Sequence, residues 1–306
     1  MSFAAFARDP SGLSSINGNK ICVVVGLGLL GCAIAQRMKQ TMIPIQEVKT
    51  TSFSWAHPEE LVLALETLVS INQCRYLEIV WSAGKGTFAA SAEEMENEFH
   101  FYQKVIEALE RLEGVDVTVS LLSSAGGLYE NSGTVDDIDA ITPTRHYAWT
   151  KLKQEKILVE STLGYRVFRL SSVYGPHFRP GGAGLINTLV ANAKAGFTTT
   201  IYGSQNTMRD YIYSDDVAKT VVADMVENAG QDKSAEFKIL ASGRAVSINM
   251  LIHIISRVTG KRAKTTFVFN NKNDRDIIFT RQVLSYAVSP TSLEEGIGVL
   301  SKMILQ

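Results

Sequence analysis

The chain has 306 residues, of which 45% are apolar and 20% are charged, and its formal net charge is −1. This length predicts one large domain or two closely packed domains. The near-neutral charge excludes a strongly basic surface of the kind that holds nucleic acid or an anionic membrane. No apolar run reaches the ~20 residues that a membrane-spanning helix needs. The three cysteines, Cys22, Cys32 and Cys74, follow no metal-ligand spacing, so we predict no metal site and a reducing, cytoplasmic location.

The first half of the chain alternates strand and helix patterns. Residues 1–18 lack the basic start and the apolar middle of a signal peptide, and we predict that they form a flexible extension before the fold. Residues 20–40 read as strand, tight turn and helix. Further strands are predicted at 45–53, 76–84, 115–126 and 165–176, and helices at 57–69, 91–112 and 145–161. This alternation predicts βαβ units and a doubly wound, mostly parallel sheet.

The elements become shorter and more mixed after Pro176. Helices are predicted at 185–196, 216–230 and 247–260, and short strands at 198–203, 209–216 and 236–242. This pattern predicts a smaller lobe over the carboxyl ends of the main strands, where such sheets bind ligands. The predicted division is a dinucleotide-binding domain at 19–175, to which 211–243 returns, and a substrate-binding lobe at 176–210 and 244–306.

The turn after the first of these strands carries a dinucleotide-binding pattern. Gly26-Leu27-Gly28-Leu29-Leu30-Gly31 matches G-x-G-x-x-G between a predicted strand and a predicted helix, which is the context that the motif requires. In such a turn Gly26 permits the tight bend, Gly28 lets a pyrophosphate approach, and Gly31 allows the helix to pack on the strand. We therefore predict a Rossmann-type α/β fold whose turn and helix start bind NAD or NADP, the alternative being a tight turn without a ligand.

The adenosine end of this predicted site departs from the usual pattern. The acid expected about 20 residues after the glycines is missing, because Glu47 lies at the start of its strand and not at its end. The segment before residue 57 has room for one strand, where two strands and a helix are usual. These residues leave NAD and NADP as equal alternatives.

The chain resembles the extended short-chain dehydrogenase/reductases, the superfamily that contains NAD(P)-dependent nucleotide-sugar epimerases, dehydratases and ketoreductases. The resemblance rests on the glycine turn, "SSAGGLYE", Tyr147-x-x-x-Lys151, "RLSSVYGP" and "MRDYIYSDDVA", in the family's order over residues 20–260. It implies a nucleotide-diphosphate sugar as partner. It also implies a homodimer, because the helical segments 93–112 and 144–161 correspond to those that the family pairs in a four-helix bundle.

Tyr147 and Lys151 lie one turn apart on one face of a predicted helix. The resemblance implies that Tyr147 is the catalytic acid–base, because a nearby ammonium and the positive nicotinamide favour a phenolate that accepts a sugar hydroxyl proton. Lys151 would supply that charge and bind the nicotinamide ribose. The third catalytic member is predicted to be Ser124, with Ser123 as the alternative, because the family's usual position holds Ala125. The other interpretations are a surface pair on a helix and two hydroxyls that only end a strand.

The resemblance also places residues around the cofactor and the substrate. Ala83 and Gly84 stand in a small-residue turn beside the cofactor. Arg209 matches the arginine that grips the diphosphate, for which a guanidinium fork is well suited. Ser172 replaces an asparagine that often binds the sugar.

Three further positions have two interpretations each. His177 is predicted to have a loop or phosphate-contact role in preference to acting as an acid. Arg179 is either a phosphate ligand or a surface arginine. Asn97 aligns with an asparagine near the family's active site, and a helix-surface position is equally open.

The motifs lack residues that some reactions of the family need, and this reduces the number of candidate reactions. Gly126-Gly127 replaces the acid pair of the 4,6-dehydratases, which argues against dehydration. We predict a nucleotide-sugar 4-epimerase that oxidises C4 to a 4-keto sugar and then re-reduces it. An NADPH-dependent 4-ketoreductase of a 4-keto-6-deoxy sugar nucleotide needs the same residues and is the alternative enzyme. A catalytically idle nucleotide-binding module is the alternative of another class, and the motifs specify neither nucleotide nor sugar.

Overall fold

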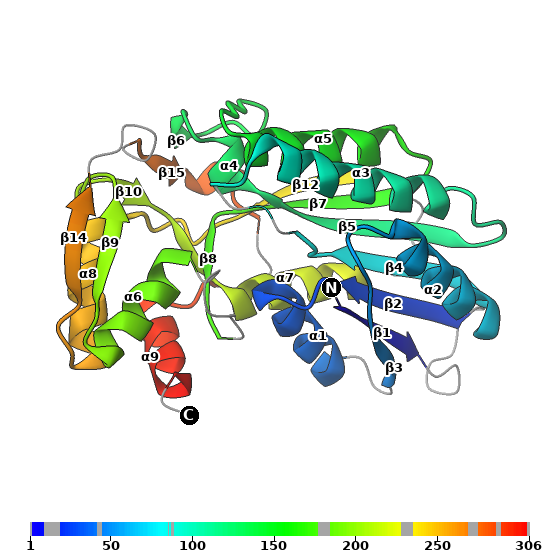
Figure 1. Ribbon diagram of the computed structural model, residues 1–306, viewed down its shortest axis with the longest axis horizontal. Coiled ribbons are helices and arrows are strands. Elements are labelled where there is room, and N and C mark those ends of the chain that lie inside the picture. The colour runs from blue at the N-terminus through cyan, green and yellow to red at the C-terminus, as the bar shows by residue number, and fades with distance from the viewer. Residues whose placement is uncertain are drawn as a thin grey trace.

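The computed structural model describes residues 2–8, 19–41, 45–84, 86, 89–176, 184–227, 235–268, 275–285 and 289–304. Its largest sheet has seven strands in the order β12-β7-β5-β4-β2-β1-β3 (Figure 1). Neighbouring parallel strands in it are β2 (Asn19–Val25), β4 (Cys74–Trp81), β5 (Asp116–Ser124), β7 (Gly164–Leu170) and β12 (Ala235–Leu240).

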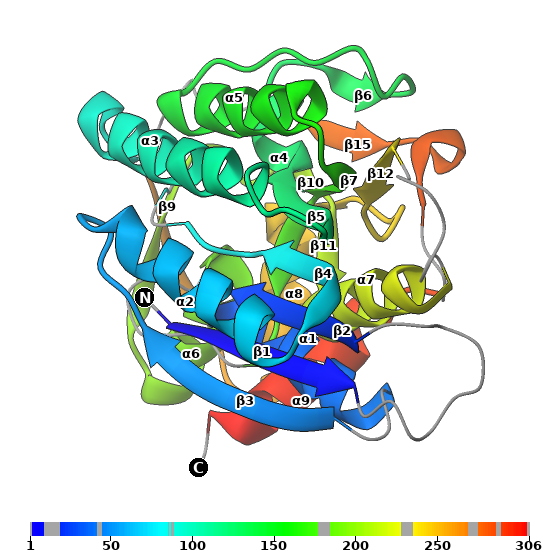
Figure 2. The same cartoon turned by 90° about the vertical axis from the view of Figure 1, so that its right-hand side faces the viewer.

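Helices cover both faces of this sheet. One face carries α1 (Leu29–Thr41) and α7 (Ser214–Glu227). The other carries α2 (Pro58–Ile71), α3 (Ala92–Leu109) and α5 (His146–Glu160), with α3 and α5 side by side (Figure 2). A parallel sheet between two helical layers confirms the predicted doubly wound α/β fold of the Rossmann type. Within the described residues, no helix is both long enough and apolar enough to cross a membrane.

Strand β2 shows why an almost continuous apolar run forms the centre of the sheet. Ile21, Val23 and Val25 pack into the core under α2 and α3, whereas Cys22 and Val24 pack into the core under α1 and α7. Successive side chains of a strand point to opposite faces, so a strand covered on both sides needs apolar residues at every position.

The N-terminal residues differ from the prediction. Residues 2–8, which we expected in a flexible extension, form β1 (Ser2–Arg8), and β1 lies antiparallel between β2 and β3 (Ile45–Ser52). Its register pairs Phe3 with Val25, so β1 begins at the edge of the sheet where β2 ends. The segment after α1 has room for only one strand, β3, and β1 occupies the position between β2 and β3 in the sheet. It pairs backbone groups of both strands that would be unpaired at an open edge.

The second lobe is built from three helices and short strands at one end of the main sheet (Figure 1). Its helices are α6 (Gly184–Ala195), α8 (Ile248–Thr259) and α9 (Leu293–Met303), which share one apolar core. Two parallel pairs are β9 (Thr198–Tyr202) with β14 (Lys264–Val268), and β8 (Ser172–Tyr174) with β11 (Tyr211–Tyr213). A four-stranded sheet has the order β13 (Val246–Ser247), β10 (Met208–Arg209), β15 (Ile277–Phe279), β6 (Gly133–Val135). Two single-turn elements complete the description, namely α4 (Ala125–Leu128) and the 3-10 helix Arg281–Val283.

The predicted strand at 209–216 is divided into two strands and the start of α7. The division falls at Asp210, which is buried and accepts hydrogen bonds from Ser171 Oγ, Ser242 Oγ and the backbone N–H groups of Ser242 and Arg244. These bonds fix Asp210 against the loop after β12, so the chain changes from one sheet to another there. A buried carboxylate needs this number of donors to offset the hydration that it loses.

Candidate active site

The glycine turn joins β2 to α1 at the carboxyl edge of the sheet. Gly26 has φ +92°, and a Cβ placed there would lie 2.5 Å from the Cα of Ala83. A Cβ at Gly31 would lie 1.9 Å from the carbonyl oxygen of Gly26, so α1 approaches the turn closely enough to exclude any side chain. Ser82 ties the turn to β4 by donating to the carbonyl oxygens of Val25 and Gly26.

Gly28 differs from the other two glycines of the motif. It is exposed, and a Cβ built on it would meet no atom within 4 Å. Leu29 and Leu30 follow at the start of α1, where the first backbone N–H groups of a helix have no partners within the helix. The open space in front of Gly28 and these N–H groups fit an anionic pyrophosphate.

A cavity of about 630 Å³ lies at the carboxyl ends of β5 and β7 and is closed by residues of the second lobe. It brings together residues that are far apart in the sequence. The predicted site residues that line it are Leu30, Ala83, Gly84, Ser123, Ser124, Tyr147, Lys151, Ser172 and Arg209. His177 and Arg179 lie outside the described residues.

Tyr147 and Lys151 are on the first two turns of α5 and face this cavity. Lys151 is 5% exposed, and its Nζ lies 5.9 Å from the centre of the Tyr147 ring. The ring lies against two glycines, because a Cβ at Gly127 would be 3.3 Å from it and a Cβ at Gly86 would be 2.9 Å from it. The absence of a side chain at Gly127 therefore makes room for the tyrosine ring.

Two carboxyl or amide oxygens surround the Lys151 ammonium. Lys151 Nζ donates to Gln154 Oε1 at 3.0 Å and lies 3.6 Å from Glu98 Oε1. Glu98 is buried on α3, whereas its neighbour Asn97, which the alignment of motifs had singled out, is exposed. The glutamate was missed because the sequence does not say which of two adjacent residues faces the neighbouring helix.

The two candidate serines have different partners. Ser124 ends β5, and its Oγ accepts the N–H of Gly127 at 3.1 Å, which leaves the hydroxyl hydrogen to be donated elsewhere. Ser123 Oγ donates to Glu155 Oε1 at 2.5 Å, and the same carboxylate is paired with Arg169 at 2.8 Å. The geometry therefore favours Ser124 for contact with a ligand, since Ser123 serves a buried ion pair.

Two arginines from different parts of the fold contribute positive charge to the cavity. Arg209 NH1 donates to the carbonyl oxygens of Met208 and Arg275, and burial lowers the pKa of its guanidinium, which nevertheless remains charged near neutral pH. A second arginine, Arg145, also lines the cavity, and its Nε lies 3.3 Å from Glu130 Oε1. The sequence analysis missed this pair, although Arg145 stands only two residues before Tyr147.

The described part of the chain contains no group of three or more His, Cys, Asp or Glu side chains placed to hold a metal ion. The cavity lining includes the phenol of Tyr147, the ammonium of Lys151, the hydroxyl of Ser124 and two guanidinium groups.

Comparison with known proteins gives matches in sequence and in fold. A family model described as the NAD dependent epimerase/dehydratase family matches residues 22–239. The UDP-glucuronate 4-epimerase of Thermodesulfobacterium geofontis is 27% identical over 208 residues, covering 63% of this chain and 61% of that protein. The dTDP-L-rhamnose 4-epimerase of Burkholderia thailandensis is 30% identical over 176 residues, covering 54% of this chain and 47% of that protein.

The chain thus spans about half to three fifths of the length of these curated relatives. Among solved structures, MoeE5 in complex with UDP-glucose and NAD has a TM-score of 0.75 at 20% identity. That match covers 92% of this chain and 98% of the other, and it shows the same fold.

Proposed function

Because the chain belongs to the NAD dependent epimerase/dehydratase family, we propose that it is an NAD-dependent nucleotide-sugar 4-epimerase. The observation that carries this proposal is one cavity that holds Tyr147, Lys151 and Ser124 between the cofactor-side residues Leu30 and Ala83 and Arg209 of the second lobe. The two curated relatives described above carry the name of 4-epimerases, which supports the choice of reaction.

The residues present fit NAD at the pyrophosphate. Gly28 leaves space that a Cβ would fill, and the start of α1 supplies backbone donors beside it. Ala83 and Gly84 bring the loop after β4 close to the same edge, and Lys151 would bind the nicotinamide ribose. When bound, NAD supplies a hydride acceptor at its nicotinamide ring.

Within the described residues, no carboxylate can be assigned to the adenosine end of the site from the strand next to β2. The strand beside β2 is β1, which runs antiparallel and so begins, not ends, at that edge. We therefore assign no residue to the adenosine ribose.

The reaction uses the chain's own residues as follows. Ser124 donates a hydrogen bond to the oxygen on C4 of the sugar, and Tyr147 accepts the proton of that hydroxyl as the carbon is oxidised. Lys151 stabilises the phenolate by its charge. The 4-keto sugar then rotates within the cavity so that its opposite face is presented for reduction. Tyr147 returns the proton to the oxygen on C4 when this carbon is reduced.

Arg209 holds the substrate by its diphosphate. A guanidinium donates two parallel hydrogen bonds to phosphate oxygens, and its partial burial strengthens them. Because these hydrogen bonds are made to the diphosphate and not to the sugar, the sugar can rotate while the nucleotide stays bound.

A 4-ketoreductase uses the same parts and is distinguished by stoichiometry. We would incubate the purified chain with UDP-, dTDP-, GDP- and CDP-sugars and NAD, and follow both the sugar products and the absorbance of reduced nicotinamide. An epimer formed without net consumption of cofactor supports the proposal. Consumption of one NADPH per 4-keto sugar identifies the reductase, and binding without turnover identifies an idle module.

We also propose that the chain acts as a homodimer in a reducing compartment. Helices α3 and α5 lie side by side on the outside of the molecule (Figure 2). Trp149 of α5 is 50% exposed. Burial of such aromatic surface favours association. The three cysteines are free thiols, which accords with cytoplasmic reducing conditions. Light scattering that shows a stable monomer at micromolar concentration would refute the dimer.

A further inference from the structure

Glu98 connects three parts of the candidate active site. Its carboxylate is 3% exposed, and Oε1 lies 3.6 Å from Lys151 Nζ. Oε2 accepts the backbone N–H of Gly86 at 3.0 Å. Gly86 in turn lies against the Tyr147 ring, where a Cβ would be 2.9 Å from the ring carbon Cδ2. One buried side chain of α3 thus contacts the lysine of α5 and the loop that follows β4.

The contacts explain why a carboxylate fits this position. A glutamate accepts with both oxygens, so it receives the lysine ammonium and the glycine N–H together. A glutamine has only one acceptor oxygen, and its amide N–H groups would face one of these two donors. A Cβ placed at Gly84 would lie 3.2 Å from Glu98 Oε1, so the backbone after β4 passes close to the carboxylate.

The charge of Glu98 acts on a small set of neighbours. Other buried ionisable side chains on the same packed elements are Tyr102 on α3, Glu155 on α5, and Arg166 and Arg169 on β7. The cavity that Lys151 shares with Tyr147 is also lined by Glu130, Arg145 and Arg209. Glu155 is already paired with Arg169 at 2.8 Å. At the start of α5, Arg145 is paired with Glu130, and His146 is exposed. Among the described residues, Glu98 is therefore the carboxylate that pairs with Lys151.

We propose that Glu98 is a positioning residue that holds Lys151 and the Gly86 loop and partly cancels the charge that Lys151 presents to Tyr147. The inference rests on the proposed function, in which Tyr147 works as a phenolate. With the carboxylate present, the phenolate is less stabilised than it would be beside Lys151 alone. A phenolate that is less stabilised suits a residue that must take back a proton and return it in the second half of the reaction.

The test compares the ionisation of Tyr147 in matched variants. The phenolate of Tyr147 is measured by ultraviolet absorbance as a function of pH, as the difference between each variant and the same variant carrying Tyr147→Phe. Glu98→Gln removes the charge and should move the midpoint to lower pH by about 1 unit, the effect of one charge at an effective dielectric constant of ~20. The rate of sugar turnover should show the same displacement of its rising limb.

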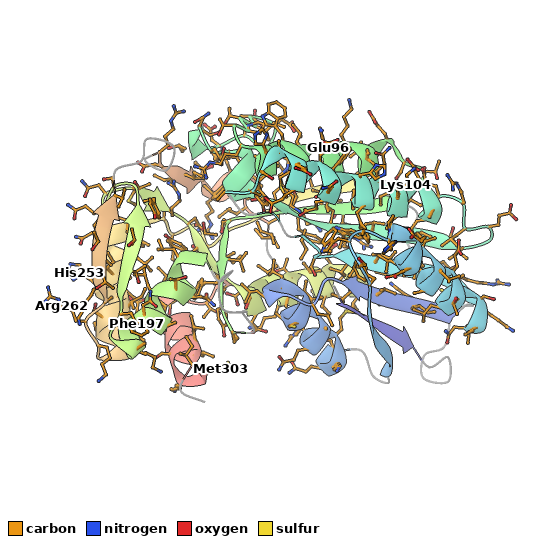
Figure 3. All side chains as sticks on the ribbon, in the orientation of Figure 1. Glu96, Lys104, Phe197, His253, Arg262 and Met303 are labelled. Atoms are coloured by element: carbon orange, nitrogen blue, oxygen red, sulfur yellow. The ribbon has the colours of Figure 1, made fainter. Side chains whose placement is uncertain are left out.

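The control is Glu96→Gln on the same helix. Glu96 is exposed on the outer surface (Figure 3). It is paired there with Lys153 at 2.9 Å, so removing its charge should leave the midpoint unchanged. Glu98→Asp and Glu98→Asn form a second pair that shortens the side chain equally and differs only in charge. If Glu98→Gln does not fold, the midpoint should still lie lower in Glu98→Asn than in Glu98→Asp.

An unchanged midpoint in Glu98→Gln, or a movement to higher pH, overturns the proposal. The absorbance measurement needs neither substrate nor cofactor. Absence of turnover with every sugar nucleotide would therefore refute the proposed function and leave the role of Glu98 to be decided by the absorbance alone.

Discussion

Two glycine-to-alanine substitutions in the glycine turn, each of which adds one methyl group, should separate the effect on stability from the effect on cofactor binding. In Gly31→Ala the new methyl group would lie 1.9 Å from the carbonyl oxygen of Gly26 and 2.6 Å from Ser82 Oγ. Because the first atom met is backbone, α1 or the turn must move. Overpacking of this kind costs about 1–3 kcal/mol, and we expect the upper part of that range.

Gly28→Ala should behave in the opposite way. Its methyl group meets no atom within 4 Å, and Gly28 is not among the glycines with positive φ, so the free energy of unfolding should change by less than ~0.5 kcal/mol. The methyl group occupies the space in front of the turn, however, and should keep a pyrophosphate from the backbone N–H groups. Loss of one or two hydrogen bonds to a charged group, each worth about 1.5–3 kcal/mol, predicts at least ~10-fold weaker binding of NAD.

Both quantities are measured on the same protein samples. Denaturant unfolding without cofactor gives the stability, and calorimetric titration with NAD gives the affinity. We expect Gly31→Ala to lose both and Gly28→Ala to lose affinity alone. Unchanged NAD affinity in Gly28→Ala would show that the pyrophosphate does not lie at this turn, and unchanged stability in Gly31→Ala would contradict the described packing of α1.

The remaining predictions concern the reaction, the substrate and the N-terminal strand. Tyr147→Phe deletes the proton-transferring oxygen and should lower turnover by at least ~100-fold with unchanged stability, as checked by steady-state kinetics and thermal unfolding; retention of most activity would assign Tyr147 to packing. Arg209→Ala should weaken sugar-nucleotide binding by about 2–4 kcal/mol while NAD binding is retained, and Arg209→Lys should recover part of the loss; equal affinity of Arg209→Ala and the unmodified chain would remove this residue from the phosphate site. Ala5→Pro removes a backbone donor from a strand paired on both sides and should destabilise the fold by more than ~1 kcal/mol, whereas Ala5→Gly keeps the donor and should cost less; equal stabilities would mean that β1 does not pair in solution.

Local pattern was sufficient for the parallel strands of the main sheet, for the helices that cover them and for the glycine turn. The alternating burial of β2 and the close approach at Gly26 and Gly31 follow from residues next to one another in the sequence. A strand period, a turn that needs glycine and a helix start are short-range properties of the backbone, so they are visible without the fold.

Pairing between distant segments was not visible in this way. Nothing in the sequence of residues 2–8 indicates that they pair with β2 and β3. Whether an antiparallel strand can insert into a parallel sheet depends on which strand edges the rest of the fold leaves open. The sequence around a helix also does not determine which side faces the neighbouring elements. Glu98 is buried and Asn97 is exposed, and a rotation of α3 by one residue about its axis would reverse this.

The buried arginines of β7 show the same division between sequence and tertiary structure. The run "YRVFRL" reads as a core strand from its apolar residues, and its two arginines look misplaced in it. The fold pairs Arg166 with Glu78 of β4 and Asp224 of α7, and pairs Arg169 with Glu155 of α5. The sequence by itself determined that a strand, a nucleotide turn and a Tyr-x-x-x-Lys helix exist. Only the tertiary structure decided which charges meet, because a buried charge is tolerated where a partner from another element replaces the water that it loses.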